Sequence, residues 1–254
     1  MTSIHCTLAP LNAGLALNPQ LSAKLQQTIV DTYRTESMSA IQLSVALSTT
    51  PPPYPTHVPV SAYQLHTVTS QVTGNSIAPL NIAVLYASAY DVPWIPEAAA
   101  AFGVMFDRGF KTADDPNDIM QRPRIGCAVF LDTIGAYRQP KDYADEVVFT
   151  TLHELGHLFN LWHIEDGSNI MTSSGFSVVS SAFWHFEAPH QDWLQNCGHD
   201  SQVTPGGDDY GGDVTGFNTP PHKPKAARSE ASLSIEVWPQ EFHFFLSLYS
   251  LISC

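Results

Sequence analysis

Basic residues are scarce in this sequence. Its 254 positions hold 11 lysines and arginines against 24 aspartates and glutamates, which gives a formal net charge of −13 at pH 7. A surface of this sign repels the phosphates of nucleic acids and the headgroups of anionic membranes. We therefore expect neither nucleic acid nor an anionic membrane surface as a partner, and a neutral or basic substrate fits the charge better.

Cysteine is also rare. The four cysteines are far apart in the sequence and form no C-x-x-C pair: Cys6, Cys127, Cys197 and Cys254. Without such a pair the sequence offers neither a cysteine-based second metal site nor a dithiol redox motif. We expect free, buried thiols, because unpaired cysteine usually behaves as a small apolar residue.

The sequence shows neither an export signal nor a membrane-spanning pattern. The first lysine is Lys24, so no basic segment opens the chain, and residues 11–17 are too short for the apolar centre of a signal peptide. Residues 242–252 form an apolar run that is too short to cross a bilayer. We expect no membrane insertion, while a secreted and a cytoplasmic location both stay open.

Length and composition predict one sizeable globular domain with an appendage. Apolar residues make up 44% of the chain and charged residues 14%, values typical of soluble globular proteins. Residues 201–231 are dominated by glycine, proline, aspartate, lysine and serine, which indicates a linker, so the main domain is expected in residues 1–200. Residues 232–254 are rich in β-forming residues and end in an apolar run, which predicts a β-rich segment of a truncated domain.

Hydrophobic periodicity predicts an α+β order of elements within the main domain. Asn18 followed by Pro19 is typical of a helix start, and apolar residues then recur at helical spacing up to Tyr33. β-forming residues, in part alternating with polar ones, predict strands over residues 41–47, 63–72, 80–87 and 126–134. Further helices are expected over residues 96–107, over a central stretch that begins at Asp142 or Asp145, and within the aromatic residues 181–197.

The most specific motif is H-E-L-G-H-L-F-N-L-W-H, residues 153–163. Residues four apart share one face of a helix, so His153 and His157 can direct their imidazoles at one point with Glu154 beside it. A zinc ion used for hydrolysis needs three protein ligands and an open position for water. His163 supplies the third ligand if the helix ends sharply, and Asn160, which tolerates the left-handed conformation, is where this turn must occur.

This motif resembles that of the metzincin zinc endopeptidases, H-E-x-x-H-x-x-G-x-x-H followed by a methionine turn. Asn160 stands where the family has glycine, and Met171 lies where the family places the methionine beneath the metal ligands. Some members carry a tyrosine two residues later, but this position is Ser173, so no auxiliary ligand is expected from it. Four residues match position for position: His153, Glu154, His157 and His163.

The resemblance implies both a fold and a reaction. The fold would be a metzincin-like zincin domain, with a twisted mixed sheet, a central active-site helix and a C-terminal helix. The resemblance further implies one zinc ion per chain and a protein or peptide substrate that adds to the edge strand of the sheet. A zinc-bound water, activated by Glu154, would hydrolyse the peptide bond. Oligomeric state and cleavage specificity are not indicated.

Two other functions fit the same residues. In a zinc hydrolase of the two-His-one-Glu type, Glu187 would replace His163 as third ligand. In a non-catalytic zinc-containing protein, the C-terminal β segment would bind a partner, although a purely structural site has no need for Glu154. Three further histidines are expected at surface or capping positions rather than as ligands: His185, His190 and His199.

Overall fold

The computed structural model describes residues 2–48, 52, 54, 58–74, 80–91, 101–105, 125–159, 161–164, 169–172 and 184–196. The predicted linker and the β-rich segment lie outside these residues, as do Asn160, Ser173 and His199. None of the helices in the described part of the chain is long and apolar enough to cross a membrane.

A five-stranded mixed sheet forms the centre of the described structure, with the strand order β2-β1-β3-β5-β4. Four strands run parallel, and the edge strand β4 pairs antiparallel with β5. The sheet is mixed, as predicted, but its mostly parallel strands with helices on both faces are typical of the α/β class rather than of the predicted α+β class. The strands are β1 (Thr2–Pro10), β2 (Ile41–Leu47), β3 (Leu80–Ala87), β4 (Gly103–Met105) and β5 (Gly126–Phe130).

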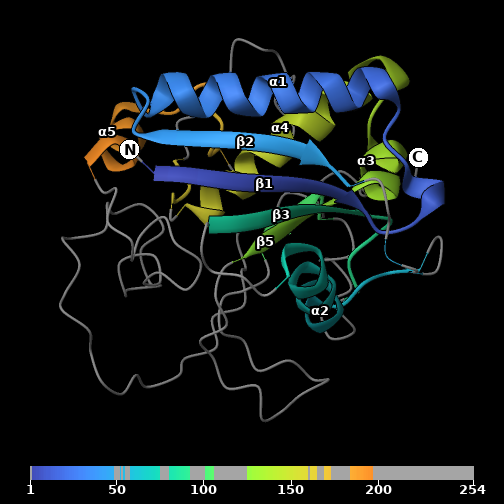
Figure 1. The fold of residues 1–254 in the computed structure, drawn as a ribbon. Coiled ribbons are helices and arrows are strands. Elements are labelled where there is room, and N and C mark those ends of the chain that lie inside the picture. Colours follow the sequence, from blue (N-terminus) through green and yellow to red (C-terminus); the bar gives the residue numbers. More distant parts are fainter. Residues whose placement is uncertain are drawn as a thin grey trace, which may run out of the picture.

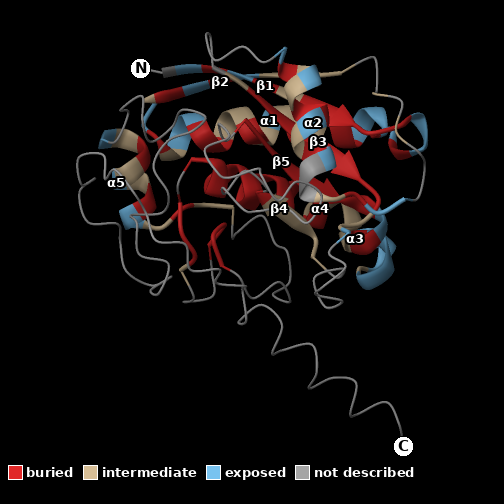
Figure 2. Ribbon diagram, turned by 90° about the horizontal axis from the view of Figure 1, so that it is seen from below, coloured by how far each residue is buried: buried red, intermediate tan, exposed pale blue. Residues whose placement is uncertain are grey.

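Helices cover both faces of the sheet (Figure 1). One face carries α1 and α4, which contact β2 and the β4–β5 pair respectively, and α2 packs mainly on β3 from the other face. Buried residues gather in the strands and along α4, whereas the exposed positions of α2, α3 and α5 face outward (Figure 2). The helices are α1 (Pro19–Glu36), α2 (Ala62–Thr73), α3 (Leu131–Tyr137), α4 (Pro140–Leu158) and α5 (Ala188–Asn196).

The first helix forms as its sequence predicts. The Asn18 side chain accepts a hydrogen bond from the Leu21 amide at 2.8 Å, and Pro19 occupies the first turn. The helical apolar stripe is buried and ends at Tyr33, whose hydroxyl donates to the carbonyl of Leu152 at 3.1 Å. This bond ties α1 to the middle of α4, one residue before the H-E-x-x-H motif.

The prediction of a strand over residues 63–72 is wrong, because these residues belong to α2. Ser61 and Gln64 form a reciprocal capping box at the start of the helix, and Gly74 ends it in the left-handed conformation with φ 69°. The helix also accommodates the threonines that suggested β-structure. The Thr69 hydroxyl, for example, donates to the backbone carbonyl of Leu65, four residues earlier in the helix.

Three other boundaries also differ from the sequence prediction. Within residues 96–107, predicted as a helix, the described part contains β4, because pairing with β5 outweighs helix propensity there. β5 ends at Phe130 rather than at residue 134, since its partner β3 ends at Ala87, opposite Phe130. The central helix starts at Pro140 with Gln139 as N-cap, so Asp142 lies in its first turn and does not open it.

The two cysteines in the described part, Cys6 on β1 and Cys127 on β5, are free and buried, as predicted. Burial raises the pKa of the Cys6 thiol to about 12. Cys6 therefore stays protonated at neutral pH and acts as an apolar core residue. β1 itself was not among the predicted elements.

Candidate metal centre

Three imidazoles meet at the end of α4. His153 and His157 lie one helical turn apart on α4, and His163 follows shortly after the helix. The Nε2 atom of His157 is 3.0 Å from that of His153 and 3.0 Å from that of His163, and the third side of this triangle measures 3.1 Å. Among the residues that the structure describes, no other group of His, Cys, Asp and Glu side chains is arranged to hold a metal ion.

The chain returns to the helix end immediately after α4. Phe159 is the C-cap residue, and the Leu161 amide donates to the carbonyl of Gly156 at 2.9 Å. A bond of this span is the 6→1 bond of the Schellman motif, which ends a helix and turns the chain. The sharp helix end that the third ligand requires is therefore present, although the predicted role of Asn160 lies outside the described residues.

Backbone carbonyls fix the orientation of two of the three rings. The Nδ1 atom of His153 lies 2.7 Å from the carbonyl oxygen of Ile170, and that of His157 lies 2.9 Å from the carbonyl oxygen of Leu161. Because a carbonyl only accepts, both Nδ1 atoms must carry the proton. Burial lowers the pKa of His153 to about 4, with the Ile170 bond opposing this shift, so this ring is neutral at pH 7.

The donor chemistry of the cluster fits one zinc ion. A neutral ring that is protonated on Nδ1 presents a lone pair on Nε2. In His153 and His157 these lone pairs point toward a common centre and toward His163, at separations of 3.0–3.1 Å. Such an arrangement is repulsive unless a cation lies among the nitrogens, and imidazole nitrogen is a preferred ligand of Zn²⁺.

Met171 packs against Gly156 of α4 and is fully buried. Its amide donates to the side chain of Asn169 at 2.7 Å, and its carbonyl accepts from the Ile164 amide at 3.1 Å, which joins the methionine segment to the residue after His163. A Cβ atom placed on Gly156 would lie only 2.4 Å from the Met171 sulfur. The glycine of the H-E-L-G-H motif thus provides the space that Met171 occupies.

We predict that Gly156→Ala lowers the free energy of unfolding by about 1–3 kcal/mol, because the new methyl group must displace Met171 from a packed site. Gly135→Ala is the matched control, since the nearest atom to its new Cβ would be 3.8 Å away. This exposed helix position should instead gain about 0.5–1 kcal/mol from the higher helix propensity of alanine. Urea denaturation of both variants measures the difference, and equal effects would contradict the close packing of Met171.

Glu154 is on α4, and its side chain packs against the edge strand β4. Its side chain is 6% exposed. A Cβ atom on Gly103 of β4 would stand 2.6 Å from its Cγ and 2.7 Å from its Oε1, so the absence of a side chain at Gly103 leaves room for the carboxylate. Burial, and secondarily the charge of Glu154, raise the pKa of the Cys127 thiol well above its ordinary value. The carboxylate is therefore held in a tight, largely water-excluded position.

The structure does not bring every candidate ligand to the cluster. Glu187 is half-buried, with its Oε1 atom 3.7 Å from the Nε2 atom of His185, and it is not in the metal-binding group of the described residues. His190 was expected at a surface or capping position, and this prediction is wrong because its side chain is fully buried. Sequence reasoning also missed the Ile170 and Leu161 carbonyls, since a backbone carbonyl has no sequence signature.

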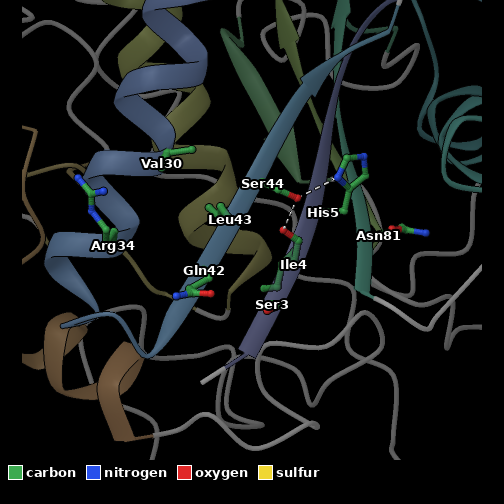
Figure 3. A pocket seen from close by; sticks show the side chains of 9 residues that line it. All are labelled: Ser3, Ile4, His5, Val30, Arg34, Gln42, Leu43, Ser44 and Asn81. Atoms are coloured by element: carbon green, nitrogen blue, oxygen red, sulfur yellow. Dashed lines mark hydrogen bonds between the residues drawn. The ribbon is translucent and has the colours of Figure 1, made fainter.

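An open groove of about 690 Å³ lies elsewhere on the molecule (Figure 3). It crosses the strands β1, β2 and β3 beside α1, and the His5 ring contacts the Ser44 hydroxyl there at 2.9 Å. None of its lining residues belongs to the histidine cluster. These residues are Ser3, Ile4, His5, Val30, Arg34, Gln42, Leu43, Ser44 and Asn81.

No family model and no curated protein matches this chain. A solved structure does: the zinc-dependent peptidase from Methanocorpusculum labreanum, with a TM-score of 0.50, 14% identity, and coverage of 76% of this chain and 100% of that chain. The fold of this chain is similar to that of a zinc-dependent peptidase. At 14% identity the similarity concerns the fold alone.

Two further solved structures match at TM-scores of 0.49. Archaemetzincin from Methanopyrus kandleri shares 16% identity, over 76% of this chain and 93% of that chain. Metalloproteinase-II from Bacteroides fragilis shares 14% identity, over 77% of this chain and 53% of that chain.

Proposed function

We propose that this protein is a zinc-dependent endopeptidase of the metzincin type. The observation that carries the proposal is the convergence of the three Nε2 atoms; Glu154, which is buried and follows His153 directly on α4, supplies the carboxylate that the proposal needs. The similarity of the fold to a zinc-dependent peptidase supports it. In this proposal the catalytic domain occupies residues 1–200, and the buried Met171 forms the floor of the site.

His153, His157 and His163 would hold the zinc ion. When bound, zinc acidifies a coordinated water and polarises the carbonyl of the scissile peptide bond. Glu154 accepts the proton of the attacking water and passes it to the nitrogen of the leaving amine. The Ile170 and Leu161 carbonyls hold two imidazoles in the tautomer that leaves Nε2 available, and Tyr33 anchors the helix one residue before the motif.

The peptide substrate would bind along β4. This strand ends the sheet in the described part of the chain, and its pairing with β5 is antiparallel. An extended peptide can add to such an edge through main-chain hydrogen bonds, which do not depend on a free chain end. Gly103 brings the backbone of β4 against Glu154, so a peptide on this edge would pass close to the proposed base.

We expect the purified protein to contain one zinc ion per chain and to cleave an unfolded protein substrate such as labelled casein. Removing zinc with a strong chelator should abolish the cleavage, and one equivalent of zinc should restore it, because the metal supplies both the acidified water and the polarisation. Elemental analysis and release of the label measure the two quantities.

Two results would count against the proposal. A protein without zinc, even after incubation with an equimolar amount, would contradict the metal site. A protein with one zinc ion that cleaves neither casein nor a mixed peptide library would instead favour the non-catalytic zinc-containing protein. Blocking both peptide ends separates endopeptidase from exopeptidase activity, since only the former tolerates the blocks.

A further inference from the structure

Helix α5 contacts both sides of the chain reversal at the metal centre. We call residues 161–164, which include His163, the third-ligand segment. The indole Nε1 of Trp193 donates to the carbonyl of Phe159, the C-cap of α4, at 3.2 Å. The same indole meets the ring of Trp162 edge-on, with 6.1 Å between ring centroids. One side chain of α5 thus contacts the end of α4 and the residue directly before His163.

His190 approaches the same segment from the preceding turn of α5. Its ring is fully buried and stands edge-on to Trp162, with ring centroids 4.7 Å apart. Within the described structure neither ring nitrogen meets the geometry of a regular hydrogen bond, and the polar group nearest in effect to the ring is the backbone of Trp162. Burial lowers the pKa of His190 to about 4, with the Trp162 backbone opposing the shift and His153 adding to it, so the ring is neutral at pH 7.

A buried imidazole without a regular hydrogen bond is unfavourable for packing alone, because an apolar ring would fill the space without the desolvation cost. His190 also has no role in the proposed metal ligation or in the proposed proton transfer. The His190 ring lies between Phe186 and Trp162, and the carbonyl of Trp162 forms the peptide bond that leads into His163. Contact with the residue before His163 therefore accounts for a buried imidazole at this position.

The support beneath α5 is firm. The Glu36 carboxylate at the end of α1 accepts from the Gln191 side chain at 2.7 Å and from the Phe186 amide at 3.2 Å. Leu194 is buried in the main core. Helix α5 is therefore joined to α1, and α1 is in turn bonded to α4 through Tyr33. These bonds hold α5 in place where it contacts the third-ligand segment.

We propose that α5 positions the third imidazole: through His190 and Trp193 it holds the third-ligand segment where His163 meets the other two histidines. It thereby sets how tightly the zinc ion is retained. Groups that orient metal ligands from outside typically change metal affinity by about 10–100-fold when they are removed. The inference rests on the proposed zinc site. His190 and Trp193 are positioning residues, since neither is proposed to touch zinc or substrate.

The test measures the zinc dissociation constant of the full chain by competition with a chromophoric chelator. Trp193→Phe keeps a ring against Trp162 and removes the N–H donor, and His190→Ala removes the edge contact. Each should raise the dissociation constant by about tenfold or more. At saturating zinc, both variants should regain the wild-type rate of peptide hydrolysis, because the reacting groups are unchanged.

Leu65→Ala is the control; Leu65 is fully buried on α2, which packs on the opposite face of the sheet from α1 and α4. The substitution leaves a cavity in the core, so it should lower the melting temperature of the metal-free protein at least as much as the other two variants. Its zinc dissociation constant should match that of the wild type. This control separates a loss of stability from a loss of ligand positioning.

The possible failures can be told apart. If wild type binds zinc and both variants bind it within about twofold of wild type, the positioning role is refuted while the proposed function stands. If Leu65→Ala weakens zinc binding as much as the two variants do, the effect belongs to general stability and the positioning role is also refuted. If wild type binds no zinc, the proposed function itself fails.

Discussion

Replacing Glu154 with glutamine is expected to slow peptide hydrolysis by about 10²–10⁴-fold, the range that a positioned general base contributes. Glutamine has nearly the same shape as glutamate but cannot accept the proton of the attacking water. The Glu154 side chain is buried against Gly103 of β4, and Glu154 is not proposed as a zinc ligand. The variant should therefore keep one zinc ion per chain. Turnover of labelled casein and elemental analysis provide the two measurements.

Glu146→Gln is the matched control for this experiment. Glu146 is another buried glutamate of α4, two turns before Glu154, and it forms an ion pair with Arg138. Burial raises the pKa of Glu146, and the Arg138 charge opposes this shift. Its substitution should reduce stability, because Arg138 loses its charged partner, but should leave the rate of hydrolysis close to wild type. A Glu154→Gln protein as active as Glu146→Gln would contradict the proposed base.

The candidate site could be anticipated because its chemistry is local in the sequence. His153, Glu154 and His157 lie within two helical turns, so helical geometry alone places them together. His163 required only that the helix end sharply, and the Leu161–Gly156 bond shows how it does. The helix after Asn18 was predictable for the same reason, since its cap and its apolar spacing are both local signals.

The parts that could not be predicted depend on contacts between distant segments. A strand over 63–72 seemed reasonable from its threonines, but burial against β3 and a reciprocal cap favoured a helix. The short strand β4 exists because β5, more than twenty residues later, provides its partner. His190 was expected at a surface or capping position because nothing in the neighbouring sequence shows that Trp162 and Phe186 enclose it. Sequence spacing carries no record of such tertiary contacts.

The identity of the third ligand gives the sharpest expected contrast between two variants. His163→Ala should lose its zinc on dialysis against a mild chelator, because only two imidazoles would remain for the metal. Glu187→Ala should keep one zinc ion per chain. The structure places the Nε2 atom of His163 3.0–3.1 Å from its two partners, whereas Glu187 lies outside the group and beside His185. Elemental analysis after dialysis measures the zinc content of both proteins.

The opposite pattern would reassign the site. If zinc stays in His163→Ala and is lost from Glu187→Ala, the protein would be a hydrolase of the two-His-one-Glu type. That outcome would require Glu187 to replace His163 in a site whose carbonyl contacts already orient His153 and His157. Melting curves of both variants without zinc ensure that a loss of metal is not a loss of fold. Because His163 is buried beside α4 and Glu187 is half exposed, zinc retention should divide the two variants clearly.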